Sequence, residues 1–529
     1  MWGRVFPSCD KNSRHNPVVR FISFRDDEER RDEMELQFEK KEISCLTQVL
    51  RSAKDQEFTQ EIRLTEDLPD VGRVLAGWGQ AILRAKEWQG SHIAASGGVQ
   101  ATVLYAPEDG SEPRTVNAWI PFQMKWDGAQ TEREGPVRIG VLLRFVDGRN
   151  LSARKILVRA GISCVAEGLT QQRTAVFNAP GMPEDLQLLR RSYPIRLPKE
   201  AGEKAFTLEQ TLETGSAPVS EILACTLQPE LSEARVSADK VALRGEGKLH
   251  LVFRDRDGRI RTRNFQVPFS QLGELENGYE GDARADVLMA VTALELDMEE
   301  ENLILKCGLV AQYMIDQRTM LELVEDAYST RREVGLRQEE LHLPMILDET
   351  TERLTAREEF PDMMLDGVDA QFWAGFPQVH REDDRVELEI PGRFQLLGYD
   401  RDGNLCSGAM NWEGKIELNA DRNGKVDTVT IPAGETQWIN MGSGMEVRAE
   451  SQVQTVTRSH GGLPMITALE LGPLREPDQD RPTLILCRPG RRNLWEIAKG
   501  TGASVQAIRT ANGLEEEPEG DRMLLIPIQ

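Results

Sequence analysis

The chain has 529 residues, of which 40% are hydrophobic and 29% are charged, a composition typical of folded domains rather than of a disordered polymer. With about 100 to 200 residues in a typical domain, this length predicts several domains rather than one core. Lys and Arg number 64 against 87 Asp and Glu, and the net charge of −23 excludes nucleic acids and anionic membrane surfaces as favoured partners.

The seven cysteines are widely spaced and include no Cys-x-x-Cys pair: they are Cys9, Cys45, Cys164, Cys225, Cys307, Cys406 and Cys487. An odd, scattered set predicts reduced thiols in a cytosol, and neither a disulfide framework nor a zinc site. No apolar run approaches the roughly 18 residues of a transmembrane helix, and no apolar segment typical of a secretion signal is present. We therefore expect a cytoplasmic protein.

Residues 1–33 are rich in Arg, Asp and Glu and show no periodicity, whereas a patterned sequence begins at Met34. We expect this segment to be either a flexible tail or an upstream start that the cell does not use, with Met34 as the physiological start.

A domain-sized repeat follows, and tight turns mark it. Strand-like stretches end in Asp-Gly, a pair favoured in hairpin turns, at Asp109, Asp257 and Asp402, which are 148 and then 145 residues apart. A second landmark keeps the period, since similar strands surround Ala160, Cys307 and Ala449. Short segments of alternating apolar and polar residues between these landmarks indicate antiparallel strands.

We therefore predict three tandem, mainly-β, sandwich-like domains at residues 34–172, 173–328 and 329–475. The stretch 320–334, at the junction of the second and third copies, is compatible with a helix instead of a strand.

A Pro-Asp motif follows the opening strand in two of the three copies. LPDVGRVL supplies Pro69 and Asp70, FPDMMLD supplies Pro361 and Asp362, and APVSEIL lacks the Pro-Asp pair. The three-copy pattern resembles the SPOCS (DUF3794) domains of endospore-forming Firmicutes, over roughly residues 34–475.

A charged, Pro-containing linker at residues 476–482 precedes a predicted βααβ unit at residues 483–529. An apolar strand covers 483–487, Asn493 and Ser504 are suitable N-caps for two short helices, and Asn512-Gly513 is a natural stop. Residues 524–526 form the returning strand. The whole segment, LCRPGRRNLWEIAKGTGASVQAIRTANGL followed by GDRMLLIP, resembles a LysM domain.

LysM domains usually bind N-acetylglucosamine polymers through two loops. Here Gly490-Arg491-Arg492-Asn493 replaces the usual Gly-Asp-Thr or Gly-Asp-Ser of the first loop, which places bulky cations where a neutral sugar would lie. This departure from the usual LysM loop favours a surface that binds a protein partner instead of a sugar. It comprises Gly490, Arg491, Arg492, Asn493, Leu494 and Trp495, with a second loop at Glu515, Glu516 and Glu517.

SPOCS-like copies followed by one LysM-like unit resemble SipL-type spore coat morphogenesis proteins. That resemblance implies a non-enzymatic scaffold in the mother-cell cytoplasm at the forespore surface. Its LysM-like unit would bind a SpoIVA-like coat ATPase, and other coat proteins would be further partners. The alternative is a LysM-mediated protein that binds peptidoglycan or N-acetylglucosamine in the cell or spore wall.

For several motifs, a purely structural role competes with a functional one. The DRDG stretches at Asp255 and Asp400 lack the later ligands of a calcium loop and are better explained as turns. No phosphate-binding loop, metalloprotease motif or nucleophile elbow is present, so we expect no enzyme, cofactor or metal. Trp495 fits a core or half-buried role better than ligand stacking, and the Arg491-Arg492 pair is either a solvated loop or a binding element.

Overall fold

A computed structural model gives the structure of residues 34–36, 39–128, 134–178, 182–215, 218–382, 385–419, 424–431, 436–459, 461–476, 482–517 and 522–528. The N-terminal segment 1–33, and with it the question of the physiological start, lies outside these residues, as does most of the predicted linker. The described chain forms antiparallel sheets, with two short helices close to the C-terminus, and this confirms the predicted fold class. No helix in these ranges is long and apolar enough to span a membrane.

The first unit is a pair of three-stranded sheets facing each other across a core. Its strands are β2 (Glu39–Arg63), β3 (Val71–Gln89), β4 (His92–Pro107), β5 (Arg114–Asp127), β6 (Val137–Ser152) and β7 (Lys155–Asn178). The sheet orders are β2-β7-β6 and β3-β4-β5. Alternating side chains such as Ile120, Phe122 and Met124 of β5 are buried between the sheets, as the period-two pattern predicts.

The second unit has the same arrangement, but its two sheets are joined, because β11 also pairs with β9 at Arg284 and Arg235. Its strands are β8 (Leu186–Glu213), β9 (Val219–Asp255), β10 (Ile260–Tyr279), β11 (Arg284–Glu299) and β12 (Asn302–Ser329), in the order β10-β9-β11-β12-β8. The long β9 folds back on itself near Ala238, whose φ is 49°. Side-chain bonds from Ser220 to the Arg254 carbonyl and from Ser232 to the Arg244 carbonyl join its two halves.

The third unit comprises β14 (Ile346–Pro361), β15 (Asp366–Ala374), β16 (Gln378–Glu382), β17 (Arg385–Tyr399), β18 (Leu405–Leu418), β19 (Gly424–Ile431), β20 (Gln437–Asn440) and β21 (Gly444–Ser459). One of its sheets is built on β14, β21 and β19, with β20 paired to β21. The other is built on β15, β17, β16 and β18.

The first and last strands of every unit are paired, as β2 with β7, β8 with β12, and β14 with β21. The Asp-Gly landmarks occupy equivalent turns, after β4, β9 and β17. Gly110, Gly258 and Gly403 have φ values of 73°, 81° and 82°, which a residue without Cβ adopts at little cost. The predicted boundary between residues 172 and 173 falls inside β7, because the turns that set the period do not mark where a strand ends.

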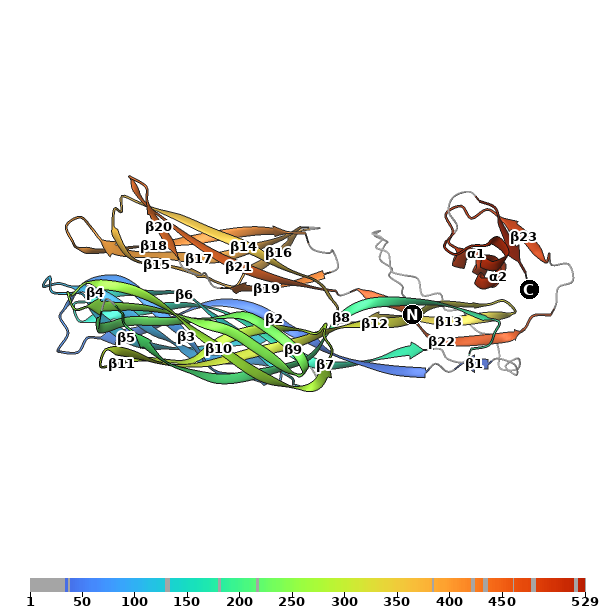
Figure 1. Ribbon diagram of the computed structural model, residues 1–529, viewed down its shortest axis with the longest axis horizontal. Coiled ribbons are helices and arrows are strands. Elements are labelled where there is room, and N and C mark those ends of the chain that lie inside the picture. The colour runs from blue at the N-terminus through green and yellow to red at the C-terminus, as the bar shows by residue number, and fades with distance from the viewer. Residues whose placement is uncertain are drawn as a thin grey trace, which may run out of the picture.

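Three paired ribbons extend from the units and pack together as a stalk (Figure 1). They are the outer parts of β2/β7 and β8/β12, and the sheet of β1 (Met34–Leu36), β22 (Gly462–Leu474) and β13 (Arg332–His342). Residues 320–334, whose pattern also fits a helix, instead form the end of β12, the bend at 330–331 and the start of β13. Every ribbon contributes to one buried cluster, with members such as Cys45, Leu197, Leu321, Leu341 and Met465.

Two buried glutamines join the units in the head, the part formed by the three sandwiches. Gln312 of the second unit binds the N–H and C=O of Ile139 in the first, at 2.9 and 2.8 Å. Gln395 of the third unit binds the N–H and C=O of Gly77 at 3.2 and 3.1 Å. Each side-chain amide makes the two hydrogen bonds that a neighbouring strand would make to that residue. The three units therefore form a single interlocked body.

The C-terminal module consists of β23 (Leu484–Cys487), α1 (Leu494–Thr501), α2 (Val505–Asn512) and β24 (Leu524–Pro527), at the free end of the stalk (Figure 1). Asn493 forms a capping box with Glu496, and Gly513 ends α2 in a left-handed conformation, as predicted. Ser504 occupies the N-cap position of α2, but its side chain makes no capping hydrogen bond.

Candidate partner-binding site

The loop between β23 and α1 is ordered by hydrogen bonds from its own backbone and from the capping box at the start of α1. Gly490 has a φ of 61°, and the N–H of Arg492 donates to the Pro489 carbonyl at 3.2 Å. The Asn493 carboxamide oxygen accepts from the Glu496 N–H at 2.8 Å, and the Glu496 carboxylate accepts from the Asn493 N–H at 3.0 Å. These bonds satisfy free N–H groups at the start of α1 and hold the loop in one conformation.

Both predicted arginines lie on the surface of this loop. Arg491 is exposed, and the Arg492 guanidinium donates to the Arg488 carbonyl at 3.2 Å. Arg492 is therefore tied along the loop, while its charge remains accessible to solvent.

The next two predicted residues have different surroundings. Leu494 is completely buried in the core of the module. Trp495 is half-buried, because its indole N–H donates to an Asp326 carboxylate oxygen at 2.8 Å and its ring meets Tyr328 edge-to-face at 4.9 Å. Asp326 and Tyr328 belong to β12, so Trp495 contacts the stalk of its own chain.

The second predicted loop adjoins the first. A carboxylate oxygen of Glu517 accepts a hydrogen bond from the Leu494 N–H at 2.8 Å, and a negative charge at a helix N-terminus is favourable. Glu515 and Glu516 are exposed beside it. The structure thus brings together the two predicted loops, with Leu494 beneath them and Trp495 directed to the stalk.

Sequence reasoning missed the stalk contact itself. Lys499 binds both carboxylate oxygens of Asp326, at 2.7 and 2.8 Å, and the Tyr328 hydroxyl donates to the Ala503 carbonyl at 2.7 Å. Burial in this contact raises the pKa of Tyr328. No local pattern could have indicated these partners, since about 170 residues separate them.

Charged groups from all three units meet at a buried cluster, here called the ionic joint. It contains Arg51, Arg138 and Glu167 of the first unit, Asp286 of the second, and Asp427 and Arg458 of the third. Arg138 lies 2.8 Å from Glu167 and 2.9 Å from Asp286, and Arg458 lies 3.1 Å from Asp427. Burial alone would raise the pKa of Glu167, but the guanidinium groups of Arg138 and Arg51 lower it to about 2.

A second polar junction between units centres on His250. Its ring lies 3.1 Å from an Asp369 oxygen and 2.7 Å from the Asn264 side-chain oxygen. The Trp78 indole donates to the other Asp369 oxygen at 2.7 Å, so residues from all three units take part. Burial opposes the charged imidazole, but Asp369 outweighs it and raises the pKa of His250.

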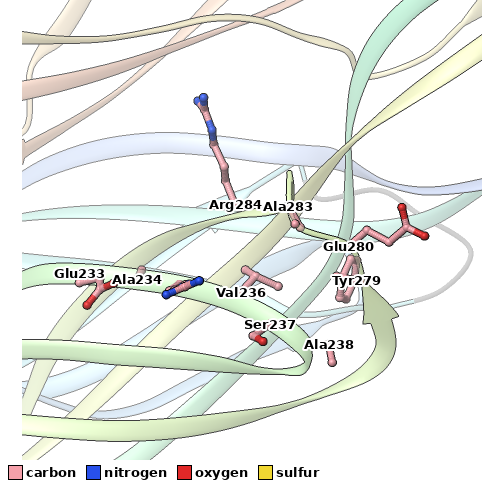
Figure 2. A pocket seen from close by; sticks show the side chains of 11 residues that line it. Glu233, Ala234, Val236, Ser237, Ala238, Tyr279, Glu280, Ala283 and Arg284 are labelled. Atoms are coloured by element: carbon pink, nitrogen blue, oxygen red, sulfur yellow. The ribbon is translucent and has the colours of Figure 1, made fainter.

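A hollow of about 430 Å³ lies where the turn of β9 meets the segment between β10 and β11 (Figure 2). Glu233–Ala238 and Tyr279–Gly281 line most of it. Two of its charged side chains already have partners, since Glu233 pairs with Arg244 at 3.5 Å and Arg284 pairs with Glu349 at 2.8 Å. No group of three or more His, Cys, Asp or Glu residues suited to a metal ion occurs in the described part of the chain.

A comparison with known families gives a match to part of the second unit. The model described as "SipL, SPOCS domain" matches residues 218–299, which comprise β9, β10 and β11 of the second unit. No curated protein and no solved structure matches the chain. A SipL SPOCS domain is therefore present in the second unit, and its presence points to a protein of spore coat morphogenesis.

Proposed function

We propose that this chain is a non-enzymatic scaffold of spore coat assembly, which binds a SpoIVA-like coat ATPase through its C-terminal module and helps to attach the coat to the forespore. The SPOCS match within residues 218–299 is the observation that carries the proposal. The first and third units have the same order of strands as the second unit, in which the match lies. This supports the inference that they too are SPOCS-like domains.

The architecture suits a scaffold. Interlocking glutamines and two buried polar junctions join the three units in the head, and the packed ribbons of the stalk lead to the module. A partner bound at the module would therefore lie at a defined distance from proteins bound at the head. The cytoplasm of the mother cell, at the forespore surface, is the proposed location.

We infer that the partner contacts the exposed loop Gly490, Arg491, Arg492 and Asn493, with Glu515 and Glu516 beside it. Leu494 supports this loop from the core, and Trp495 fixes the module on the stalk. Exposed cations next to carboxylates orient an approaching protein that carries complementary charges, and the arginines would face an acidic patch.

Charge reversal tests this assignment. In the full chain, Arg491→Glu with Arg492→Glu should slow association with the purified SpoIVA-like ATPase and change its dependence on salt, while circular dichroism stays unchanged. A matched control is Arg256→Glu with Arg401→Glu, since both residues are exposed in turns of the head. Unchanged association of the first variant would remove the arginines from the site.

Co-sedimentation with purified peptidoglycan tests the alternative function. We expect no tight binding, because the loop presents bulky cations instead of the small polar residues of glycan-binding relatives. Tight binding to peptidoglycan, without binding to the ATPase, would replace the scaffold proposal with a glycan-binding one.

A further inference from the structure

The outer face of the β23–β24 sheet exposes a group of large apolar side chains. Leu484, Leu486 and Leu525 are 53%, 64% and 37% exposed, and Met523, immediately before β24, is 46% exposed. Leu486 and Leu525 are directly paired across the strands, so they lie on the same face. The alternate residues of both strands pack inward on the helices: Ile485, Cys487, Leu524 and Ile526.

The stalk covers the other side of the module. Trp495 and Lys499 of α1, with the Ala503 carbonyl, contact Asp326 and Tyr328 of β12. Figure 1 shows the helices toward the stalk and β23 on the side away from it. The contact therefore directs the apolar face outward, where another molecule can reach it.

Single exposed apolar side chains are normal on a protein surface, and Leu272 of the head is one such residue. Four of them together, three on two paired strands and Met523 directly before one of these, are a different case, because contiguous apolar patches mark interaction sites. Aliphatic side chains offer no hydrogen bonds to sugar hydroxyls, and a glycan would gain little from this face.

Cationic residues border one end of the patch. Arg488 directly follows β23 and Arg522 directly precedes Met523, and both are exposed. The pairing of Cys487 with Leu524 places these two arginines at the same end of the sheet, from which the loop with Arg491 and Arg492 continues. Such a border is complementary to carboxylates.

We propose that this outer face, formed by Leu484, Leu486, Met523 and Leu525, is the docking surface for a segment of a protein partner in which apolar residues are followed by carboxylates. The inference rests on the proposed function and deepens it, because it names the chemistry of the partner segment and the face of the module that receives it. In a symmetric dimer, a second copy of the chain would bring the same cationic border to this face and would lack this complementarity.

The test uses the full chain with Leu486→Glu, and with Leu272→Glu as the matched control of similar exposure. Circular dichroism should show both to be folded, since both side chains point to solvent. Arg488→Glu tests the border without altering the sheet. Two probes are used: the purified SpoIVA-like ATPase, and a synthetic peptide of alternating leucines ending in a run of glutamates, compared with the same peptide ending in lysines.

Leu486→Glu should weaken binding to the ATPase and to the glutamate peptide by at least about tenfold, with Leu272→Glu unchanged and the lysine peptide binding poorly. Arg488→Glu should weaken binding of the glutamate peptide. If the ATPase binds Leu486→Glu as well as the wild type, the inference is overturned and the proposed function stands.

If the wild type does not bind the ATPase but binds the glutamate peptide through Leu486, the proposed function fails and the inference stands. Binding to neither probe overturns the inference. Sedimentation of the wild type supplies a last outcome: a concentration-dependent dimer that Leu486→Glu abolishes would assign this face to self-association and overturn the inference.

Discussion

At the scale of single residues, buried charges decide how the three units fit together. Glu167 is completely buried between two arginines of its own unit, with Arg138 at 2.8 Å and Arg51 at 3.7 Å. These arginines also reach Asp286 of the second unit and Asp427 of the third. Such a group is costly to bury and specific in its partners, because removing one member leaves the others charged without compensation. The ionic joint therefore fixes the relative positions of the units more than it adds to their stability.

Glu167→Gln should lower the free energy of unfolding by about 3 kcal/mol, because Arg138 and Arg51 lose the carboxylate they share. Each then keeps a single one, Asp286 or Asp427. Denaturant unfolding of the variant and the wild type measures the difference. Glu61→Gln is the control, since Glu61 forms an exposed pair with Lys155 and should change the stability by less than about 1 kcal/mol. Equal effects of the two changes would contradict a special role for the joint.

The same carboxyl group predicts a response to acid. Its pKa is about 2 in the folded chain, below the ordinary value of 4.5, so its contribution is fully present above pH 4.5. The contribution is lost as the pH falls toward 2. The acid-induced loss of stability in Glu167→Gln should therefore be smaller than in the wild type, when both are followed by thermal unfolding across this range.

His250 should respond in the opposite direction. Its folded pKa is raised above the ordinary value of 6.5, so the stability from its pair with Asp369 is fully present below pH 6.5. That stability is lost as the pH rises through the raised folded pKa. His250→Gln, which cannot titrate, should remove this part of the pH dependence of the melting temperature, and an unchanged profile would exclude His250 as its source.

At the scale of elements, short-range chemistry explains where the helices of the module begin. Asn493 accepts from the Glu496 N–H at 2.8 Å and is part of a full capping box, whereas the Ser504 side chain makes no capping bond. The two positions therefore differ in what their side chains contribute, although both residue types suit an N-cap.

Asn493→Ala should destabilise the module by about 1 kcal/mol, and Ser504→Ala should have a much smaller effect. Amide hydrogen exchange in α1 and α2 of the full chain measures both. Equal exchange in the two variants would show that the capping box contributes nothing to the stability of α1.

At the scale of the whole molecule, the module is held on the stalk by a few polar contacts. Asp326 receives the Trp495 indole N–H and the Lys499 ammonium group, and Tyr328 packs against Trp495. Asp326→Ala should release the module, which small-angle scattering would detect as a broader distribution of interatomic distances. Asp297→Ala, at an exposed position of β11, should leave the scattering unchanged.

The sequence by itself determined the features that depend on near neighbours. Alternating side chains indicated the strands, Gly110, Gly258 and Gly403 marked the turns through their tolerance of positive φ, and Asn493 and Gly513 bounded the helices. Each of these signals acts within a few residues, and the local backbone conformation is enough to express it. The surface loop of the candidate site could be predicted for the same reason.

Only the tertiary structure decided which distant residues meet. Charge spacing does not reveal that Arg138 meets Asp286 or that Arg51 meets Asp427, because these pairs form when strands from different units pack together. Trp495 was predicted as part of the partner surface, and its indole lies on the stalk because Asp326 and Tyr328 approach it from 169 and 167 positions earlier in the chain. The outward face of β23 and β24 follows from that contact, since a strand's alternation defines two faces but only packing selects which one is covered.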